Sequence, residues 1–374
     1  MDTKRSDNFS QPPAGHPDCD LFCRVVDNFG DIGVCWRLAR CLAREHGWSV
    51  RLWVDAPESL AKIAPEAASE SGITVLHWTD NVALPPPAGC VIEAFGCSPP
   101  AAFVSAMAQR QPAPRWINLE YLSAEDWVDG CHRLPSIDPA TGLRKYFFFP
   151  GFTPGTGGLL RERNLFVRRD AWRAAHAAAS GVFHVSLFAY ENPSIPGLLT
   201  ALRTAPHPSH LWVPEGRALA SLNAQSGLAL SPGDCVSHGT LTVSALPFMD
   251  QDDYDALLWR CDLNLVRGED SFVRAQWAAR PFVWQIYPQQ EDAHIAKLDA
   301  FFERYAARLS ASCRKLLQRI WRGWNTAHPV VGEDWHLLVA VHAELQAHAV
   351  RWADELARQD DLATQLVLFN QTPI

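Results

Sequence analysis

Short apolar runs typical of β-strands alternate along this chain with stretches whose apolar residues recur at helical spacing. In the first half, we expect strands over residues 21–26, 49–54, 73–78, 90–95 and 116–119. Between the first two runs, the apolar positions from Val34 to Glu45 follow the period of a helix. Strands that alternate with helices are typical of parallel βαβ units, so the sequence predicts an α/β fold.

A second series of the same kind follows a loop rich in Gly and Pro at residues 150–158. Its expected strands are residues 182–187, 211–213, 241–246, 263–266 and 282–286, and its expected helices are residues 195–203, 254–260, 271–279 and 294–306. Residues 335–367 have a helical pattern that runs almost to the end of the chain.

The length of 374 residues exceeds what one hydrophobic core usually organises, so we predict two Rossmann-like domains. The first is expected to comprise residues 19–165 together with about 350–374, and the second residues 166–349. Residues 1–18 are polar and rich in Pro, which predicts a flexible extension.

The composition excludes several classes of protein. Hydrophobic residues make up 48% of the chain and charged residues 20%, which is typical of globular proteins. Because 33 Lys and Arg face 41 Asp and Glu, the net charge is −8, and we expect no nucleic-acid partner. No stretch approaches the roughly 20 apolar residues of a membrane span, and the first residues do not resemble a signal peptide. We therefore expect a cytoplasmic protein without a membrane partner.

The cysteines and histidines give no sign of disulfides or metal sites. The ten cysteines are scattered without C-x-x-C pairs, so we expect reduced thiols. The 14 histidines form no Cys/His cluster with zinc spacing, so we expect no metal.

The first motif that could carry chemistry follows the first expected strand and opens the first helix. Its residues are Asp27, Asn28, Phe29, Gly30, Asp31, Ile32 and Gly33. Ligands of open α/β sheets bind outside the carboxyl ends of the strands, and glycines allow close approach of the chain. Asp31 and Asp27 could act there as a base and its helper. Alternatively, Asp31 caps the helix and Asp27 shapes the turn.

The second motif follows the expected strand at residues 263–266, again before a helix. It consists of Arg267, Gly268, Glu269, Asp270 and Ser271. Backbone N–H groups at a helix N-terminus, with an arginine beside them, suit a diphosphate. One of the two acidic residues could contact a sugar hydroxyl or could simply cap the helix.

Two further motifs end strands of the second half. Ser186, Phe188 and Tyr190 lie in one of them, where the aromatic rings could stack on a base or pack into the core. Gln251 lies in the other, where its amide could bind a pyrimidine edge, although the run around it could also be a helix cap. All four motifs lie on loops that lead from a strand to a helix, so we expect them to line a common cleft.

Six segments make the chain resemble the elongation factor P arginine rhamnosyltransferases, the EarP family. They are DNFGDIGVCWRLAR (27–40), WINLEYLSAEDWV (116–128), FFFPGFTPGTGGLLRE (147–162), SLFAYEN (186–192), PFMDQDDYD (247–255) and RGEDSFVRAQWAARPFVWQIYPQQEDAH (267–294). They occur in the expected order, cover nearly the whole chain and show no departure at the positions that carry chemistry. The residues before Cys19 are not part of the pattern.

The resemblance implies a GT-B glycosyltransferase, in which two Rossmann-like domains face each other across a cleft. It implies inverting transfer of L-rhamnose from dTDP-β-L-rhamnose to the guanidinium of one arginine of elongation factor P. The α-rhamnosyl-arginine formed would activate the factor for rescue of ribosomes stalled at polyproline. The first domain would engage the protein acceptor and the second would hold the nucleotide sugar.

On this chain, the resemblance and the chemistry of the motifs assign catalytic roles to three carboxylates. Asp31 is expected to accept the guanidinium proton and Asp27 to orient the guanidinium. Glu269 is expected to contact the sugar or the network around the arginine. No metal cofactor is expected, because Arg267 and a helix N-terminus can stabilise the departing diphosphate.

Other residues of the motifs are expected to bind substrate. Phe188, Tyr190 and Gln251 would hold the thymidine, and Asp270 and Ser271 would lie near the phosphates. The remaining members of the expected substrate-binding set are Asn28, Phe29, Gly30, Gly33, Ser186 and Gly268.

Two other classes of protein could use the same architecture. One is a nucleotide-sugar or protein-binding module whose aspartates are only caps, and the other is a nucleotide-sugar epimerase without a protein acceptor. The transferase alone needs a carboxylate of the first domain that faces the anomeric carbon of the donor.

Overall fold

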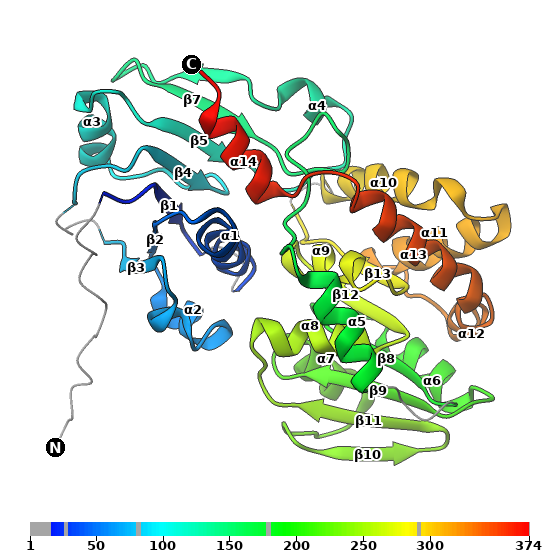
Figure 1. Ribbon diagram of the computed structural model, residues 1–374. Helices are drawn as coiled ribbons and strands as arrows, with labels where there is room; N and C mark the ends of the chain where they lie inside the picture. The colour runs from blue at the N-terminus through cyan, green and yellow to red at the C-terminus, as the bar shows by residue number, and fades with distance from the viewer. Residues whose placement is uncertain (1–15, 26–28, 80–83, 177–180, 290–292, 374) are drawn as a thin grey trace, which may run out of the picture. The chain divides into compact units, whose positions relative to one another are not determined.

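The computed structural model describes residues 16–25, 29–79, 84–176, 181–289 and 293–373. The chain divides into two compact units (Figure 1). Unit 1 comprises Met1–Arg163 and Gln359–Ile374, and unit 2 comprises Asn164–Arg358. The boundaries between the units therefore lie after Arg163 and after Arg358. The sequence predicted them after residue 165 and near residue 350.

Among the described residues of unit 1, seven strands form one sheet in the order β3-β2-β1-β4-β5-β7-β6. Neighbouring strands are parallel up to β7, and β6 pairs antiparallel with β7 at the edge. The strands are β1 (Cys19–Cys23), β2 (Val50–Val54), β3 (Ile73–His77), β4 (Cys90–Ala94), β5 (Arg115–Leu119), β6 (Pro135–Ile137) and β7 (Arg144–Phe148). β1, β2, β4 and β5 are buried along their whole length, as is typical of parallel strands covered on both faces.

The helices of unit 1 cover this sheet. They are α1 (Gly30–His46), α2 (Pro57–Ile63), α3 (Ala101–Gln109), α4 (Trp127–Cys131) and α14 (Leu362–Gln371), with a short 3-10 turn at Ala67–Ser69. In α1, Trp36, Leu38 and Leu42 are fully buried in the core. The helix ends at Gly47, whose φ of 69° and N–H bond to the Ala43 carbonyl close its last turn.

The end of the chain returns to unit 1. α14 packs against α1 and contributes Leu362, Leu366 and Phe369 to the core of unit 1. The backbone approaches the loop at residues 150–158 so closely that a Cβ on Gly158 would collide with the Asp360 carbonyl oxygen. Gly158 also has a φ of +70°, so this position requires glycine on both grounds.

Among the described residues of unit 2, six strands form a second sheet in the order β10-β11-β9-β8-β12-β13. The strands are β8 (Phe183–Leu187), β9 (Ser209–Pro214), β10 (Cys235–His238), β11 (Leu241–Leu246), β12 (Leu263–Arg267) and β13 (Phe282–Gln285). All of these pairs are parallel except that β10 runs antiparallel to β11.

Unit 2 is richer in helix than unit 1. Its helices are α5 (Leu165–Ala175), α6 (Ile195–Thr204), α7 (Arg217–Ser226), α8 (Gln251–Arg260), α9 (Asp270–Trp277), α10 (Ala293–Tyr305), α11 (Ala311–Asn325), α12 (Gly332–Ala340) and α13 (His342–Leu356), with a 3-10 turn at Ala306–Arg308. Aromatic side chains from three helices and β13 pack together, for example Phe301 stacked on Trp321 with ring centroids 5.8 Å apart. Phe272, Phe282 and Tyr305 also belong to this cluster.

Every strand and helix expected from the sequence overlaps an observed element, but some bounds differ and several elements were not expected. β1 ends at Cys23 and not at residue 26. The helical pattern at residues 335–367 is not one helix but parts of α12, α13 and α14. β6, β7 and β10 were not expected: β10 is exposed along its whole length, and β7 begins with Arg144 and Lys145 before its aromatic residues. The helices α2, α3, α4, α5, α7 and α11 were not expected either. In the part of the chain that the structure describes, no helix is both long and apolar enough to span a bilayer.

Candidate active site

Both sheets contain a point at which the order of the strands reverses. In unit 1, the chain moves outward from β1 to β2 and β3, then crosses to β4 on the other side of β1. In unit 2, it moves from β8 to β9 and β11, then crosses to β12. Loops that leave two such neighbouring strands diverge at the carboxyl edge of the sheet and form the usual ligand-binding crevice of open α/β sheets. Three of the four motifs predicted from the sequence follow β1, β8 and β12, at these two points, and the fourth, which contains Gln251, follows β11.

Asp31 is the second residue of α1, directly after the loop that follows β1. The N-cap position belongs to Phe29, whose side chain makes no capping hydrogen bond, so Asp31 does not occupy the cap position. Asp31 is 5% exposed and lies in the first turn of a helix, where the helix dipole favours negative charge. The structure thus places a sheltered carboxylate at the carboxyl edge of unit 1.

The neighbours of Asp31 in the motif are only partly described. Phe29 and Gly30 begin the helix, and the Gly33 N–H donates to the Phe29 carbonyl at 2.9 Å. Asp27 and Asn28 lie outside the described residues. Their predicted roles therefore stay predictions.

Buried contacts hold α1 in place below Asp31. The Arg37 guanidinium, which is 1% exposed, donates from Nη1 to the Glu162 carboxylate at 3.3 Å. Glu162 belongs to the segment 147–162, to which no role was assigned from the sequence. Burial and nearby Cys23 raise the pKa of the Cys35 thiol one turn below Asp31, and the charge of Asp31 adds to this effect. The thiol beneath Asp31 is therefore neutral.

The centre of the unit 2 site is Arg267, the last residue of β12. Its guanidinium carbon lies 4.5 Å from the centre of the Phe188 ring and 4.7 Å from that of Tyr190, both of which follow β8. Nη1 also donates to the Ala189 carbonyl at 3.5 Å. Stacking on two rings fixes the plane of an arginine while its charge is retained. The structure thus brings together Arg267, which was predicted to bind the diphosphate, and the two rings that were predicted to stack on the nucleobase.

The turn between β12 and α9 is held by its own backbone and by Ser271. Gly268 has a φ of +63°, its N–H donates to the Gln285 carbonyl at 3.1 Å, and its carbonyl accepts from the Trp284 indole at 2.7 Å. The Ser271 hydroxyl donates to the Arg267 carbonyl, so it closes the turn. Glu269 holds the N-cap position of α9, but its side chain makes no capping bond. The capping alternative for Glu269 is therefore not seen, and this residue is half-buried at the start of α9.

Gln251 and Asp270 meet across the N-termini of α8 and α9. Gln251 Nε2 donates to Asp270 Oδ2 at 3.3 Å. The cap of α8 is Asp250, whose carboxylate accepts from the Asp253 N–H at 2.8 Å. The capping alternative thus applies to Asp250, while Gln251 points toward the second motif.

Ser186 does not reach this surface. It is fully buried in β8, and its hydroxyl donates to Asn264 Oδ1 of the neighbouring β12 at 2.7 Å. Its position supports a role in joining the two strands and gives no support to the predicted contact with the donor.

Arg217 and Glu191, to which no role was assigned from the sequence, lie beside the same rings. The Arg217 guanidinium carbon lies 4.9 Å from the Tyr190 ring centre, and Nε donates to the Glu191 carboxylate at 3.0 Å. This pairing with Arg217, assisted by the nearby charge of Arg267, lowers the pKa of Glu191. Two guanidinium groups therefore contact Tyr190. Arg217 lies at the start of a helix after a strand, which is a signal that could have found it.

Two exposed aromatic residues were also missed at the carboxyl edge of unit 1. Tyr121 follows β5 and stacks on Phe95, which follows β4, with ring centroids 4.8 Å apart. Trp127 is 52% exposed and packs edge-on against Phe149, which follows β7. These rings share the carboxyl edge of the sheet with Asp31.

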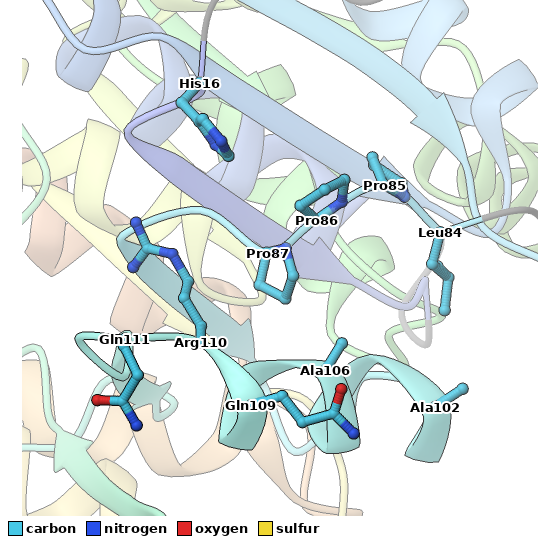
Figure 2. Close-up of a pocket in the computed structure, with 10 residues that line it drawn as sticks. All are labelled: His16, Leu84, Pro85, Pro86, Pro87, Ala102, Ala106, Gln109, Arg110 and Gln111. Carbon is cyan, nitrogen blue, oxygen red and sulfur yellow. The ribbon is translucent and has the colours of Figure 1, made fainter.

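A cavity of about 850 Å³ lies at the amino ends of the unit 1 strands, opposite to their carboxyl ends (Figure 2). It is lined by the run Pro85, Pro86 and Pro87, which leads into β4, and by Arg110 at the end of α3. Because these residues precede parallel strands, the cavity lies at their amino ends, away from Asp31. The described residues contain no cluster of three or more His, Cys, Asp or Glu side chains that could hold a metal.

Comparisons with known proteins identify relatives over almost the entire length. Residues 19–371 match the model of the family described as elongation factor P (EF-P) rhamnosyltransferase EarP. A protein-arginine rhamnosyltransferase of Pseudomonas putida is 50% identical over 369 residues, which cover 94% of this chain and 97% of that protein.

Solved structures give the fold. One, described as the structural basis for EarP-mediated arginine glycosylation of translation elongation factor EF-P, is 37% identical, with a TM-score of 0.65 over 95% of this chain and 99% of its own. The glycotransferase of kitacinnamycin is only 13% identical but has a TM-score of 0.52 over 95% of this chain and 99% of its own. The chain has the GT-B glycosyltransferase fold that these neighbours share.

Proposed function

The chain belongs to the EarP family of elongation factor P rhamnosyltransferases, and on that premise we propose that it transfers L-rhamnose from dTDP-β-L-rhamnose to one arginine of elongation factor P. The family match over residues 19–371 is the observation that carries the activity. We further propose that the reaction inverts the anomeric centre and gives α-rhamnosyl-arginine. The modified factor would then act on polyproline-stalled ribosomes in the cytoplasm.

The chemical difficulty lies in the acceptor. A guanidinium has a pKa above roughly 12, so its nitrogen is a poor nucleophile. A carboxylate that binds the guanidinium can localise its charge and accept the proton as the N–C bond forms. Asp31 is our candidate for this base, because it is a sheltered carboxylate at the carboxyl edge of unit 1. Asp27 would orient the guanidinium.

The departing dTDP develops negative charge as the C–O bond breaks. Arg267, held on Phe188 and Tyr190, supplies a fixed positive charge, and Arg217 adds a second one beside Tyr190. We propose that Phe188, Tyr190 and Gln251 hold the thymidine, while Asp270 and Ser271 lie near the phosphates. Glu269, which is half-buried at the start of α9, would contact the sugar.

The direct test is the intact mass of elongation factor P after incubation with this protein and dTDP-rhamnose. A mass increase of one deoxyhexose is expected, and fragmentation should locate it on an arginine. An unchanged mass with intact donor would favour a nucleotide-sugar-binding module. A changed sugar nucleotide with unmodified factor would favour an epimerase.

Metal removal should leave the transfer unaffected. The diphosphate has Arg267 and the N-terminus of α9 as positive partners, which can take the place of a divalent cation. The rate of modification should therefore be the same before and after exhaustive EDTA treatment. Activity that disappears with EDTA and returns with Mg²⁺ or Mn²⁺ would contradict this scheme.

A further inference from the structure

A buried ion pair joins the two helices that begin at the donor site of unit 2. Arg274 of α9 donates from Nε to Asp255 Oδ1 at 2.9 Å and from Nη2 to Asp255 Oδ2 at 2.5 Å. Arg274 is 2% exposed and Asp255 1%. The pair is bidentate, so it fixes both the distance and the relative orientation of the two side chains.

The pair lies one turn behind the predicted donor-binding residues. Asp255 follows Gln251 by four residues on α8, and Arg274 follows Asp270 by four residues on α9. Residues four apart lie on the same face of a helix. The ion pair and the contact between Gln251 and Asp270 are therefore two successive links between the same helices.

The order of the strands does not by itself place the starts of these two helices side by side. α8 follows β11 and α9 follows β12, and two strands separate β11 from β12 in the sheet. The position of Gln251 relative to Asp270 thus depends on how α8 packs on α9 and on β8.

Stability alone gives little reason for a charged pair at this place. The cost of removing two charges from water offsets much of their attraction, and well-packed apolar side chains often serve a core equally well. An apolar contact cannot supply the fixed geometry of a planar guanidinium that binds both oxygens of a carboxylate.

We propose that Asp255 and Arg274 are positioning residues for the donor: they hold the first turns of α8 and α9 so that Gln251 and Asp270 face the nucleotide together. The proposal rests on the assignment of the donor to unit 2. Neither residue needs to touch the substrate.

The test compares Arg274→Lys with Arg51→Lys in the full-length protein. Arg51 is an equally buried arginine in unit 1 that donates to both oxygens of Asp20 at 2.6 Å, but it lies in the unit without the donor. Both changes keep the positive charge but remove the planar guanidinium that binds both carboxylate oxygens, so both should lower Tm.

Calorimetric titration with dTDP separates the two variants. Arg274→Lys should weaken dTDP binding roughly tenfold, the effect of one weakened hydrogen bond to a charged group. Arg51→Lys should leave it unchanged. Equal affinities in both variants, whether weakened or not, would overturn the proposal.

A double variant covers the case in which Arg274→Lys fails to fold. Asp255→Leu combined with Arg274→Met leaves no buried charge unpaired and should regain much of the stability. The proposal expects dTDP binding to stay weak in this variant, so wild-type affinity would overturn it. Failure of the wild-type protein to bind dTDP is a different result, which would overturn the donor assignment itself.

Discussion

Asp31→Asn is expected to reduce rhamnosyl transfer by at least about 100-fold, the usual loss when a general base is removed. Asparagine keeps the size of the side chain but cannot accept the guanidinium proton. Because Asp31 lies in unit 1, the affinity for dTDP should stay at the wild-type value. The measurements are the rate of modification of elongation factor P and a calorimetric titration with dTDP.

Asp55→Asn is a matched control for this change. Asp55 follows β2, the neighbour of β1, so it lies at the same edge of the sheet as Asp31. Its Oδ1 accepts the Val25 N–H at 2.9 Å, and an asparagine oxygen can make the same bond. Turnover close to that of wild type is expected. If Asp31→Asn also turned over normally, another group would have to be the base.

Most elements could be predicted because each has a local signal. β11 was predicted with its observed bounds, since Leu241, Val243 and Ala245 alternate with Thr242 and Ser244 in the sequence. In the structure, these residues alternate between buried and half-buried. β10 could not be predicted, because an exposed antiparallel edge strand is held by its pairing with β11 and not by burial. The breaks between α12, α13 and α14 were also not predicted. The apolar pattern continues through them, although the successive helices bury their apolar faces against different helices. α14 packs on α1 of unit 1, whereas α13 packs on α9 of unit 2.

The site could be predicted in part for a related reason. A parallel strand carries its following loop to a known edge, so the motifs after β1, β8 and β12 could be placed from the sequence. Whether a side chain points to that edge or to a neighbouring strand depends on strand register. The Ser186 side chain points to the neighbouring strand β12. Arg217 became a member of the site only through the fold, because it is 27 residues from Tyr190 along the chain and contacts its ring.

Arg267→Ala is expected to lower kcat about 100-fold or more, because it removes a fixed charge from the place where the diphosphate departs. Arg267→Lys should retain part of the activity, since lysine keeps the charge but loses the planar stacking on the two rings. Arg260→Ala is the matched control: its guanidinium also stacks on two rings, Trp172 and Trp212, but it ends α8 at the opposite end of that helix from Gln251. Its kcat should be close to that of wild type.

The contact between Arg267 and Phe188 changes what Phe188→Ala should do. The sequence alone suggests that loss of the ring raises the donor KM with a smaller effect on kcat, because stacking on a base stabilises ground state and transition state alike. In the structure, the same ring supports Arg267 at 4.5 Å. Phe188→Ala should therefore also lower kcat, and this loss of kcat should be smaller when Arg267 is already alanine.

Donor-saturation kinetics of the two single variants and the double variant measure this coupling. Residues in contact commonly show coupling of about 0.5–3 kcal/mol, so the effect of Phe188→Ala on kcat should shrink at least about twofold in the Arg267→Ala background. Binding of elongation factor P, measured by calorimetric titration, should be unaffected in all three. Strictly additive effects would mean that Phe188 does not act through Arg267. A higher donor KM with unchanged kcat in Arg267→Ala would mean that the guanidinium binds the donor equally in ground and transition states, and the stabilisation of the leaving diphosphate would then have to come from the backbone N–H groups of α9 and from Arg217.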